Sequence, residues 1–178
     1  MKEKKSEIDL NSYEIGFVKP EQKFLVNGAV ELVNHFNGKG LMLAANLKQY
    51  TELAAKNTLV VAKNSFGTVI GTAAYTQFYK DDVWEFGGWA VSEEYQHKGI
   101  GMGVINKLFS ENPHFKTIAF GNKNSGPLFE SLGAEILIDH SVLPEEAFEL
   151  CKECPNKPEV GCCDTIYNLA PIIESLSK

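Results

Sequence analysis

The segment Val91-Ser92-Glu93-Glu94-Tyr95-Gln96-His97-Lys98-Gly99-Ile100-Gly101-Met102-Gly103 carries the most informative pattern in the chain. A strand-like run ends at residue 91, a short polar loop follows, and a helical pattern begins near residue 99. Glycines at 99, 101 and 103 remove side chains from the first turn of that helix. Its unpaired backbone N–H groups can then approach an anion, aided by the positive end of the helix dipole. The segment therefore predicts a phosphate-binding turn, to which Gln96 and Lys98 can add polar and cationic contacts.

The glycine spacing excludes two other phosphate-binding motifs. G-x-G-x-G does not have the spacing of the dinucleotide fingerprint, and the Gly-Lys-Ser/Thr of the nucleoside-triphosphate loop is missing. The alternative is that the glycines only allow close packing of the helix. Three alternating helical glycines would each cost about 1 kcal/mol relative to alanine, and this cost favours phosphate binding.

The chain on either side of this segment predicts an α/β domain of the α+β kind, with a partly antiparallel sheet. Two strand-like runs at 58–62 and 68–78, joined by a short loop at 64–67, indicate a hairpin. The other strands are expected at 14–18, 83–91, 117–120 and 135–138, and the helices at 21–36, 47–56, 99–110 and 126–132.

The composition is that of a globular protein: 178 residues, 44% hydrophobic and 22% charged. The net charge of -6 excludes a global cationic surface for nucleic acid. No apolar run reaches the roughly 18 to 20 residues of a membrane helix, and no signal peptide is recognised. We expect a cytoplasmic protein without nucleic-acid or membrane partners, and a homodimer stays open. The expected organisation is a disordered N-terminus (1–12), one domain (13–140) and a cysteine-containing C-terminal arm packed on that domain (141–178).

Two motifs resemble the GNAT acetyltransferase superfamily. Gln96-His97-Lys98-Gly99-Ile100-Gly101 is similar to the family's acetyl-CoA motif, Gln/Arg-x-x-Gly-x-Gly/Ala. The stretch 122–134 is similar to a second motif, an asparagine followed by a helix ending in Tyr-x-x-x-Gly. The resemblance covers roughly residues 13–140. It implies a splayed central sheet flanked by helices, with acetyl-CoA as co-substrate between the strands 83–91 and 117–120.

The resemblance also implies which residues contact acetyl-CoA. The strand end would hold the pantetheine and the thioester, the backbone amides from 96 to 103 the pyrophosphate, and the second motif the other side. The implied contacts are Trp89, Ala90, Val91, Gln96, His97, Lys98, Gly99, Ile100, Gly101, Met102, Gly103, Asn122, Ser125 and Phe129.

The second motif departs from the family at Phe129, where many members have a tyrosine that protonates the departing thiolate. Phenylalanine cannot donate a proton, so solvent or Ser125 would supply it. A thiolate is a tolerable leaving group, since a cysteine thiol has a pKa around 8.5. Core packing is therefore the better interpretation of Phe129.

Glu85 is the candidate general base. Strand alternation places residues 83, 85, 87, 89 and 91 on one face, and Glu85 is the ionisable side chain of that strand. Apolar neighbours raise the pKa of a carboxyl, which suits a base that works near neutral pH. In several GNAT enzymes a glutamate at this offset takes the proton of the amine, often through water. The alternative is an ordinary glutamate that faces solvent.

The expected function is acetyl transfer from acetyl-CoA to a primary amine by direct attack, the acceptor being an amino acid or another small molecule. The alternatives are a protein N-acetyltransferase and a catalytically silent CoA-binding module. The arm resembles the tail of short bacterial N-acetylglutamate synthases at 143–146, 151–155 and 163–164. The chain contains no arginine, however, and lysine lacks the bidentate fork that grips a carboxylate. A glutamate acceptor is therefore not favoured over other amines.

The four cysteines of the arm leave two interpretations open. Cys151 and Cys154 have the spacing of zinc ligands, whereas the adjacent Cys162 and Cys163 are awkward as two ligands of one tetrahedron. Disulfides are not expected in a cytoplasmic chain. Buried free thiols are the favoured alternative, and no metal site is assigned.

Overall fold

The structure is a computed structural model and describes residues 12–139, 141, 143–148 and 165–178. Residues 1–11 of the N-terminus expected to be disordered (1–12) and the four cysteines fall outside these ranges. Apart from short 3-10 turns, the described elements are β1 (Tyr13–Phe17), α1 (Lys23–Asn37), α2 (Leu47–Ala55), β2 (Leu59–Asn64), β3 (Val69–Phe78), β4 (Trp84–Val91), α3 (Ile100–Glu111), β5 (Thr117–Gly121), α4 (Gly126–Ser131), β6 (Glu135–Ile136), β7 (Thr165–Asn168) and α6 (Ala170–Leu176).

The expected helices and strands up to residue 132 are present, each within two residues of its predicted ends. α1 buries Ala29, Leu32 and Val33 of the apolar stripe that predicted it, whereas Phe24 of that stripe is exposed. Asn46 caps the N-terminus of α2, and its side chain accepts a hydrogen bond from the Gln49 amide at 2.9 Å. This cap satisfies one of the free N–H groups of the first turn.

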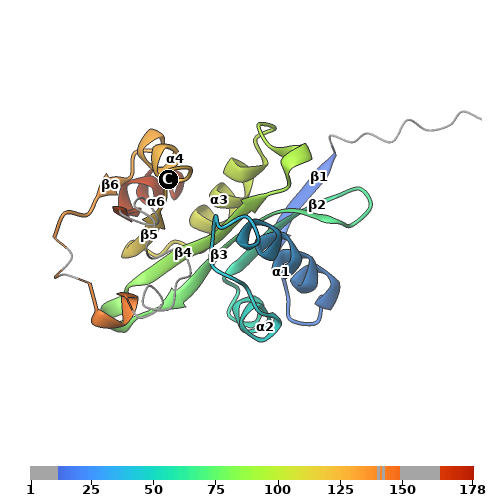
Figure 1. Ribbon diagram of the computed structural model, residues 1–178, viewed down its shortest axis with the longest axis horizontal. Coiled ribbons are helices and arrows are strands. Elements are labelled where there is room, and N and C mark those ends of the chain that lie inside the picture. The colour runs from blue at the N-terminus through green and yellow to red at the C-terminus, as the bar shows by residue number, and fades with distance from the viewer. Residues whose placement is uncertain (1–11, 140, 142, 149–164) are drawn as a thin grey trace, which may run out of the picture.

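The strands form one open sheet in the order β1-β2-β3-β4-β5-β7-β6. The pairing is antiparallel except between β4 and β5, which are parallel. Helices cover both faces: α1 and α2 pack on one side, and α3 and α6 on the other. Figure 1 shows α1 and α2 beside the strands β2 to β4, with α4, β6 and α6 gathered at the opposite end. The predicted mixed, partly antiparallel fold is confirmed.

The sheet is splayed between β4 and β5. Their ladder has two registered pairs in the described structure, Trp84 with Thr117 and Glu85 with Ile118. Beyond these pairs the strands separate, so the second half of β4 has its free edge towards an opening. A parallel pair that ends early leaves backbone groups there to bind something else. The expected splayed sheet is thus present.

A bulge interrupts β4 at the opening. Ala74 pairs with Gly87 and Thr72 pairs with Ala90, so Gly88 and Trp89 together oppose a single residue of β3. Gly88 has a φ of 59°, a conformation that glycine adopts without a steric penalty.

The bulge corrects one expectation about the faces of β4. Trp89 and Val91 pack with Phe86 in the core cluster on the α3 side, whereas Glu85, next to Phe86 in the chain, points to the other side. A strict alternation that places residues 85, 89 and 91 on one face is therefore wrong, because an extra residue reverses the alternation.

The C-terminal residues complete the sheet. β7 inserts between β5 and β6, and α6 buries Ile172 and Ile173 in the same cluster as α3. No strand was expected there. The strand expected at 135–138 is shorter, because β6 ends at Ile136 and the exposed fraction of Ile138 is 89%.

Candidate active site

Glu85 lies at the last residue pair before β4 and β5 separate. Its carboxylate accepts a hydrogen bond from the Tyr79 hydroxyl. Burial raises the pKa of Glu85 above its ordinary value, and the Tyr79 and Thr76 hydroxyls oppose this shift by favouring the carboxylate. A largely buried carboxyl with one tyrosine partner can bind and release a proton closer to neutral pH than an exposed glutamate.

The Tyr79 side chain is held by residues from three distant parts of the chain. It packs with Val83, Ile118 and Ala147 in one buried cluster. The turn containing Ala147 is fixed in addition by an ion pair between Lys80 and Glu146, 2.6 Å from nitrogen to oxygen. The surroundings of Glu85 therefore depend on residues 143–148, which the sequence pattern did not connect with it.

The bulge places an aromatic group at the opposite end of the opening. The Trp89 indole nitrogen donates a hydrogen bond to the Gly101 carbonyl at 3.1 Å, so the strand is tied to the first turn of α3. The Trp89 ring lies 5.6 Å from the Phe129 ring. Phe129 is buried and also contacts Phe86 and Tyr167. Phe129 thus lies in the hydrophobic core.

The three glycines of the turn differ in what a side chain would meet at each position. Gly99 caps α3 with a φ of 80°, and nothing lies within 4 Å of the position of a β-carbon. A β-carbon on Gly101 would lie 3.3 Å from the Trp89 indole nitrogen. One on Gly103 would collide with Ile15 of β1. Close packing therefore accounts for Gly103, whereas the open space at Gly99 leaves the helix N-terminus accessible.

The other residues of the turn divide into exposed and buried ones. Gln96, His97 and Lys98 are exposed. Ile100 is buried in the core, and Met102 is half-buried. His97 has a φ of 61°, which is uncommon for a residue with a side chain. The backbone from 96 to 99 thus follows a tight path that exposes its polar groups in front of α3.

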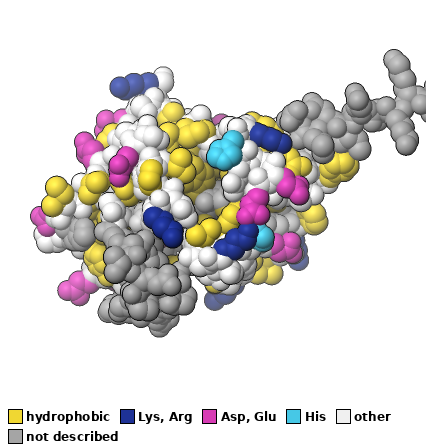
Figure 2. Space-filling view, turned by 45° about the horizontal axis from the view of Figure 1, so that its top comes forward, with side chains coloured by type: hydrophobic (Ala, Val, Ile, Leu, Met, Phe, Trp, Pro, Cys, Tyr) yellow, Lys and Arg dark blue, Asp and Glu magenta, His cyan; other side chains and the backbone are white. Residues whose placement is uncertain are grey.

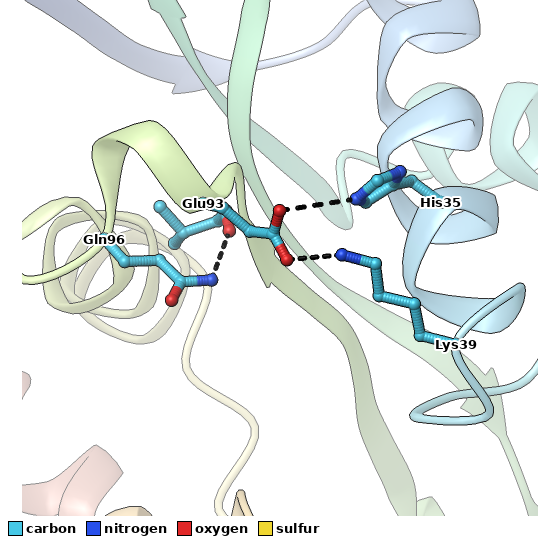
Figure 3. A network of polar contacts seen from close by, with 5 residues as sticks. His35, Lys39, Glu93 and Gln96 are labelled. Carbon is cyan, nitrogen blue, oxygen red and sulfur yellow. Dashed lines mark hydrogen bonds and ion pairs between the residues drawn. The ribbon is translucent and has the colours of Figure 1, made fainter.

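An ionic network connects this turn with α1. Glu93 accepts a hydrogen bond from Lys39 and lies 4.0 Å from His35, and the Gln96 side chain donates to the Val91 carbonyl at 3.0 Å. Figure 3 shows Glu93 between the end of α1 and the turn, with Gln96 bound back to the strand. The Lys39 ammonium lowers the pKa of Glu93. These contacts hold the turn against the strand end; sequence reasoning did not predict them.

Asn122 spans the opening from the β5 side. Its side-chain nitrogen donates to the Leu41 carbonyl at 2.9 Å, and its side-chain oxygen accepts from the Ser125 amide at 3.0 Å. The Ser125 hydroxyl in turn accepts from the Asn122 amide. The connection between α1 and α2, to which Leu41 belongs, therefore touches the end of β5. This bridge ties together the two halves of the splayed sheet.

A hollow of about 230 Å³ adjoins Asn122, lined also by Gly121, Gly126 and Tyr167. Its shape depends on glycine, because a β-carbon on Gly126 would lie 2.8 Å from the Tyr167 hydroxyl. On the face drawn in Figure 2, hydrophobic side chains gather in a central strip with lysine side chains on both sides. Asp and Glu side chains lie among these lysines in the same view, so the charge of this face is mixed.

The described part of the chain contains neither a metal-binding cluster nor a helix that could cross a bilayer. No cluster of three or more His, Cys, Asp or Glu side chains there could hold a metal ion. None of the helices in those ranges is long and apolar enough to cross a bilayer. The open question about zinc at Cys151, Cys154, Cys162 and Cys163 concerns residues outside these ranges.

A protein-family model matches more than half of the chain. The model of the acetyltransferase (GNAT) family matches residues 32–134. No curated protein matched the sequence.

Several solved structures share the fold. An N-acetylglutamate synthase from Neisseria gonorrhoeae, complexed with coenzyme A and N-acetyl-glutamate, superposes with a TM-score of 0.68 at 17% identity, over 88% of this chain and 34% of that one. An acetyltransferase of the GNAT family from Staphylococcus aureus Mu50 gives 0.61 at 12% identity, over 88% and 97%. A diaminobutyrate acetyltransferase from Paenibacillus lautus, in complex with L-2,4-diaminobutyric acid and coenzyme A, gives 0.54 at 12% identity, over 75% and 87%. The chain thus spans about a third of the Neisseria synthase.

Proposed function

The chain belongs to the acetyltransferase (GNAT) family, and from this premise we propose that it transfers the acetyl group of acetyl-CoA to the primary amine of an amino acid or another small molecule. Glu85 is the proposed general base. The observation that carries the proposal is the position of this partly buried carboxylate at the point where β4 and β5 separate. A proton acceptor there stands beside the opening into which a ligand can enter.

The chain's own groups fit acetyl-CoA. The free edge of β4 from Gly87 to Val91 offers backbone partners for an extended chain of amide groups. The uncovered N-terminus of α3, with Gly99 and the exposed Lys98 in front of it, suits a pyrophosphate. Asn122 and the end of β5 form the other wall.

The proposed reaction joins the amine nitrogen to the acetyl carbon and breaks the carbon–sulfur bond. An ammonium group has no lone pair, so Glu85 accepts a proton from the amine, directly or through a water molecule. The electron pair of the broken bond leaves on sulfur. Because Phe129 is buried and cannot donate a proton, solvent provides the proton for the thiolate in this scheme.

An amino acid or small amine is favoured as acceptor for two reasons. The hydrogen-bond partner of Glu85, Tyr79, is buried with Val83, Ile118 and Ala147, and such confined surroundings suit a small molecule. Two proteins of the same fold are crystallised with small amino acids or their acetylated products. A protein amine remains the alternative acceptor.

Release of thiol from acetyl-CoA in the presence of a panel of amino acids, diamines and lysine-containing peptides tests the proposal. We expect release above the background rate with at least one small amine, and a product one acetyl group heavier by mass spectrometry. A protein that binds CoA but releases no thiol with any amine would instead be a CoA-binding module.

A further inference from the structure

The hydroxyl of Tyr50, a buried residue of α2, has no hydrogen-bond partner among the described residues. The exposed fraction of its side chain is 2%, and burial alone raises its pKa above the ordinary value, with no hydrogen bond opposing the shift. Among the described residues, Thr72 alone has a side-chain oxygen that is fully shielded from solvent and has no hydrogen-bond partner. The Tyr50 oxygen is therefore not sealed, and what remains exposed of this side chain includes its hydroxyl.

A second buried tyrosine shows the usual arrangement. Tyr75 has an exposed fraction of 1%, and its hydroxyl donates to the Asn112 carbonyl at 3.0 Å. Buried polar groups in proteins are nearly always hydrogen-bonded, and leaving one unpaired costs about 1–3 kcal/mol. The Tyr50 hydroxyl has no such partner in the described protein but is not sealed from solvent, so water or a ligand at the opening can pair with it.

The hydroxyl of Tyr50 points at the bulge of β4. The position of a β-carbon on Gly88 lies 2.5 Å from the Tyr50 oxygen and 3.9 Å from a Thr76 methyl carbon. Gly88 is one of the two residues of the bulge, three residues from Glu85 along the strand. The hydroxyl therefore lies over the strand segment that borders the opening, on the face where Glu85 points.

We propose that the Tyr50 hydroxyl donates a hydrogen bond to the carbonyl oxygen of the acetyl group, the atom on which negative charge develops during transfer. This inference rests on the proposed function, which places the acetyl group beside the bulge of β4. Tyr50 keeps its proton at the pH of the reaction, because its pKa is raised. A fixed donor aimed at a developing negative charge stabilises the transition state more than the ground state.

Tyr50→Phe tests the inference, with Tyr75→Phe as the matched control. In Tyr50→Phe we expect kcat to fall about 10- to 1000-fold, with little change in the KM of the amine and an unchanged or higher melting temperature, since no protein hydrogen bond is lost. Tyr75→Phe loses the bond to Asn112 and should melt about 2–4 °C lower while keeping the wild-type kcat.

A binding measurement tests the same donor without turnover. The probe is a CoA thioether that carries a trifluoromethyl ketone, which hydrates to a tetrahedral centre with two hydroxyl groups in place of the acetyl carbonyl. Calorimetry should show weaker binding of this probe to Tyr50→Phe than to the wild type, about 10-fold or more. The affinity of both proteins for CoA itself should agree.

The outcomes separate this inference from the proposed function. If the wild type releases no thiol with any amine but Tyr50→Phe weakens binding of the ketone, acetyl transfer fails and the hydrogen bond stands. If Tyr50→Phe changes neither kcat nor the affinity for the ketone, the inference is overturned. An increase in the KM of the amine alone would also overturn it, because Tyr50 would then contact the acceptor.

Discussion

At the residue scale, the partly buried carboxyl of Glu85 connects proton transfer with stability. In the proposed function it takes the amine's proton, and Glu85→Gln keeps its size but removes the proton acceptor. We expect the rate at neutral pH to fall roughly 10²- to 10⁴-fold. The rate should recover in part at alkaline pH, where more of the amine is neutral without help. Rates measured across pH, together with acetyl-CoA affinity, check this; the affinity should barely change.

The stability of the same variant gives an independent control. The pKa of Glu85 is raised in the folded chain, so between the unfolded value of about 4.3 and the higher folded value the folded protein binds more protons than the unfolded one. Its stability therefore falls as pH rises through that window. Glu85→Gln should remove this loss. The stability of the variant minus that of the wild type should therefore be larger at pH 7 than at pH 4. Glu31→Gln, the same change at an exposed position of α1, should show no such difference. A wild-type rate in Glu85→Gln at neutral pH would contradict the assignment.

At the scale of elements, the first turn of α3 is the proposed site of the cofactor's phosphates. Gly101→Glu adds a side chain between α3 and β4, next to Trp89 and Val91, and places a negative charge beside those phosphates. Glutamate in the first turn is favourable for the helix itself, so the main loss should be in binding. We expect CoA affinity to fall about 10-fold or more, which is about 1.4 kcal/mol, and the rise in melting temperature caused by CoA to shrink.

Gly16→Glu is the matched control for this change. It adds the same charge on β1, where nothing lies within 4 Å of a β-carbon, and should keep the wild-type affinity. Gly101→Ala separates size from charge, because it adds the β-carbon alone. Wild-type CoA affinity in a folded Gly101→Glu variant would argue against a phosphate site at this turn.

Local sequence patterns predicted some features of the helices and strands and missed others. The spacing of apolar residues and the positions of glycines predicted the helices α1 to α4 and the β2–β3 hairpin. Local patterns suffice for these elements, because helices and hairpins form between residues that are close in the chain. The bulge of β4 reversed the expected faces of Trp89 and Val91. The pair Gly87-Gly88 was a possible signal, since glycine inside a strand often marks a bulge. The unpartnered hydroxyl of Tyr50 had no signal, because burial and partners depend on the packing of α2 on the sheet.

At the scale of the whole molecule, the sequence did not predict how the end of the chain returns to the sheet. β7 has four residues and no alternation of its own, and it becomes a strand by pairing with β5 and β6. Non-local pairing of this kind leaves little trace in a short segment. Likewise, the position of Tyr79 beside Glu85 depends on Ala147, far along the chain. The motifs predicted the turn and proposed Glu85 as the base, whereas the residues that surround Glu85 could be identified only in the folded chain.

The two halves of the splayed sheet are joined by few strand pairs, so their helices must supply the remaining connection. β4 and β5 share two registered pairs, while α6, which follows β7, packs against α3, which lies on β1 to β3. Ile173 of α6 has an exposed fraction of 0% and belongs to the core cluster that contains the buried residues of α3. Residues at this contact should therefore stabilise the whole domain.

Ile173→Ala tests this connection, with Ile138→Ala as a control of the same residue type. Removing a fully buried isoleucine side chain leaves a cavity between α6 and α3, and we expect the free energy of unfolding to fall by about 2–5 kcal/mol. Ile138 has an exposed fraction of 89%, and its replacement should change stability by less than about 0.5 kcal/mol. Urea unfolding followed by circular dichroism measures both, and a single transition for Ile173→Ala would show that the halves unfold together. Equal stability of the two variants would mean that residues 165–178 are a peripheral arm, and that the β4–β5 pairs and the hydrogen bond from Asn122 to Leu41 hold the halves together.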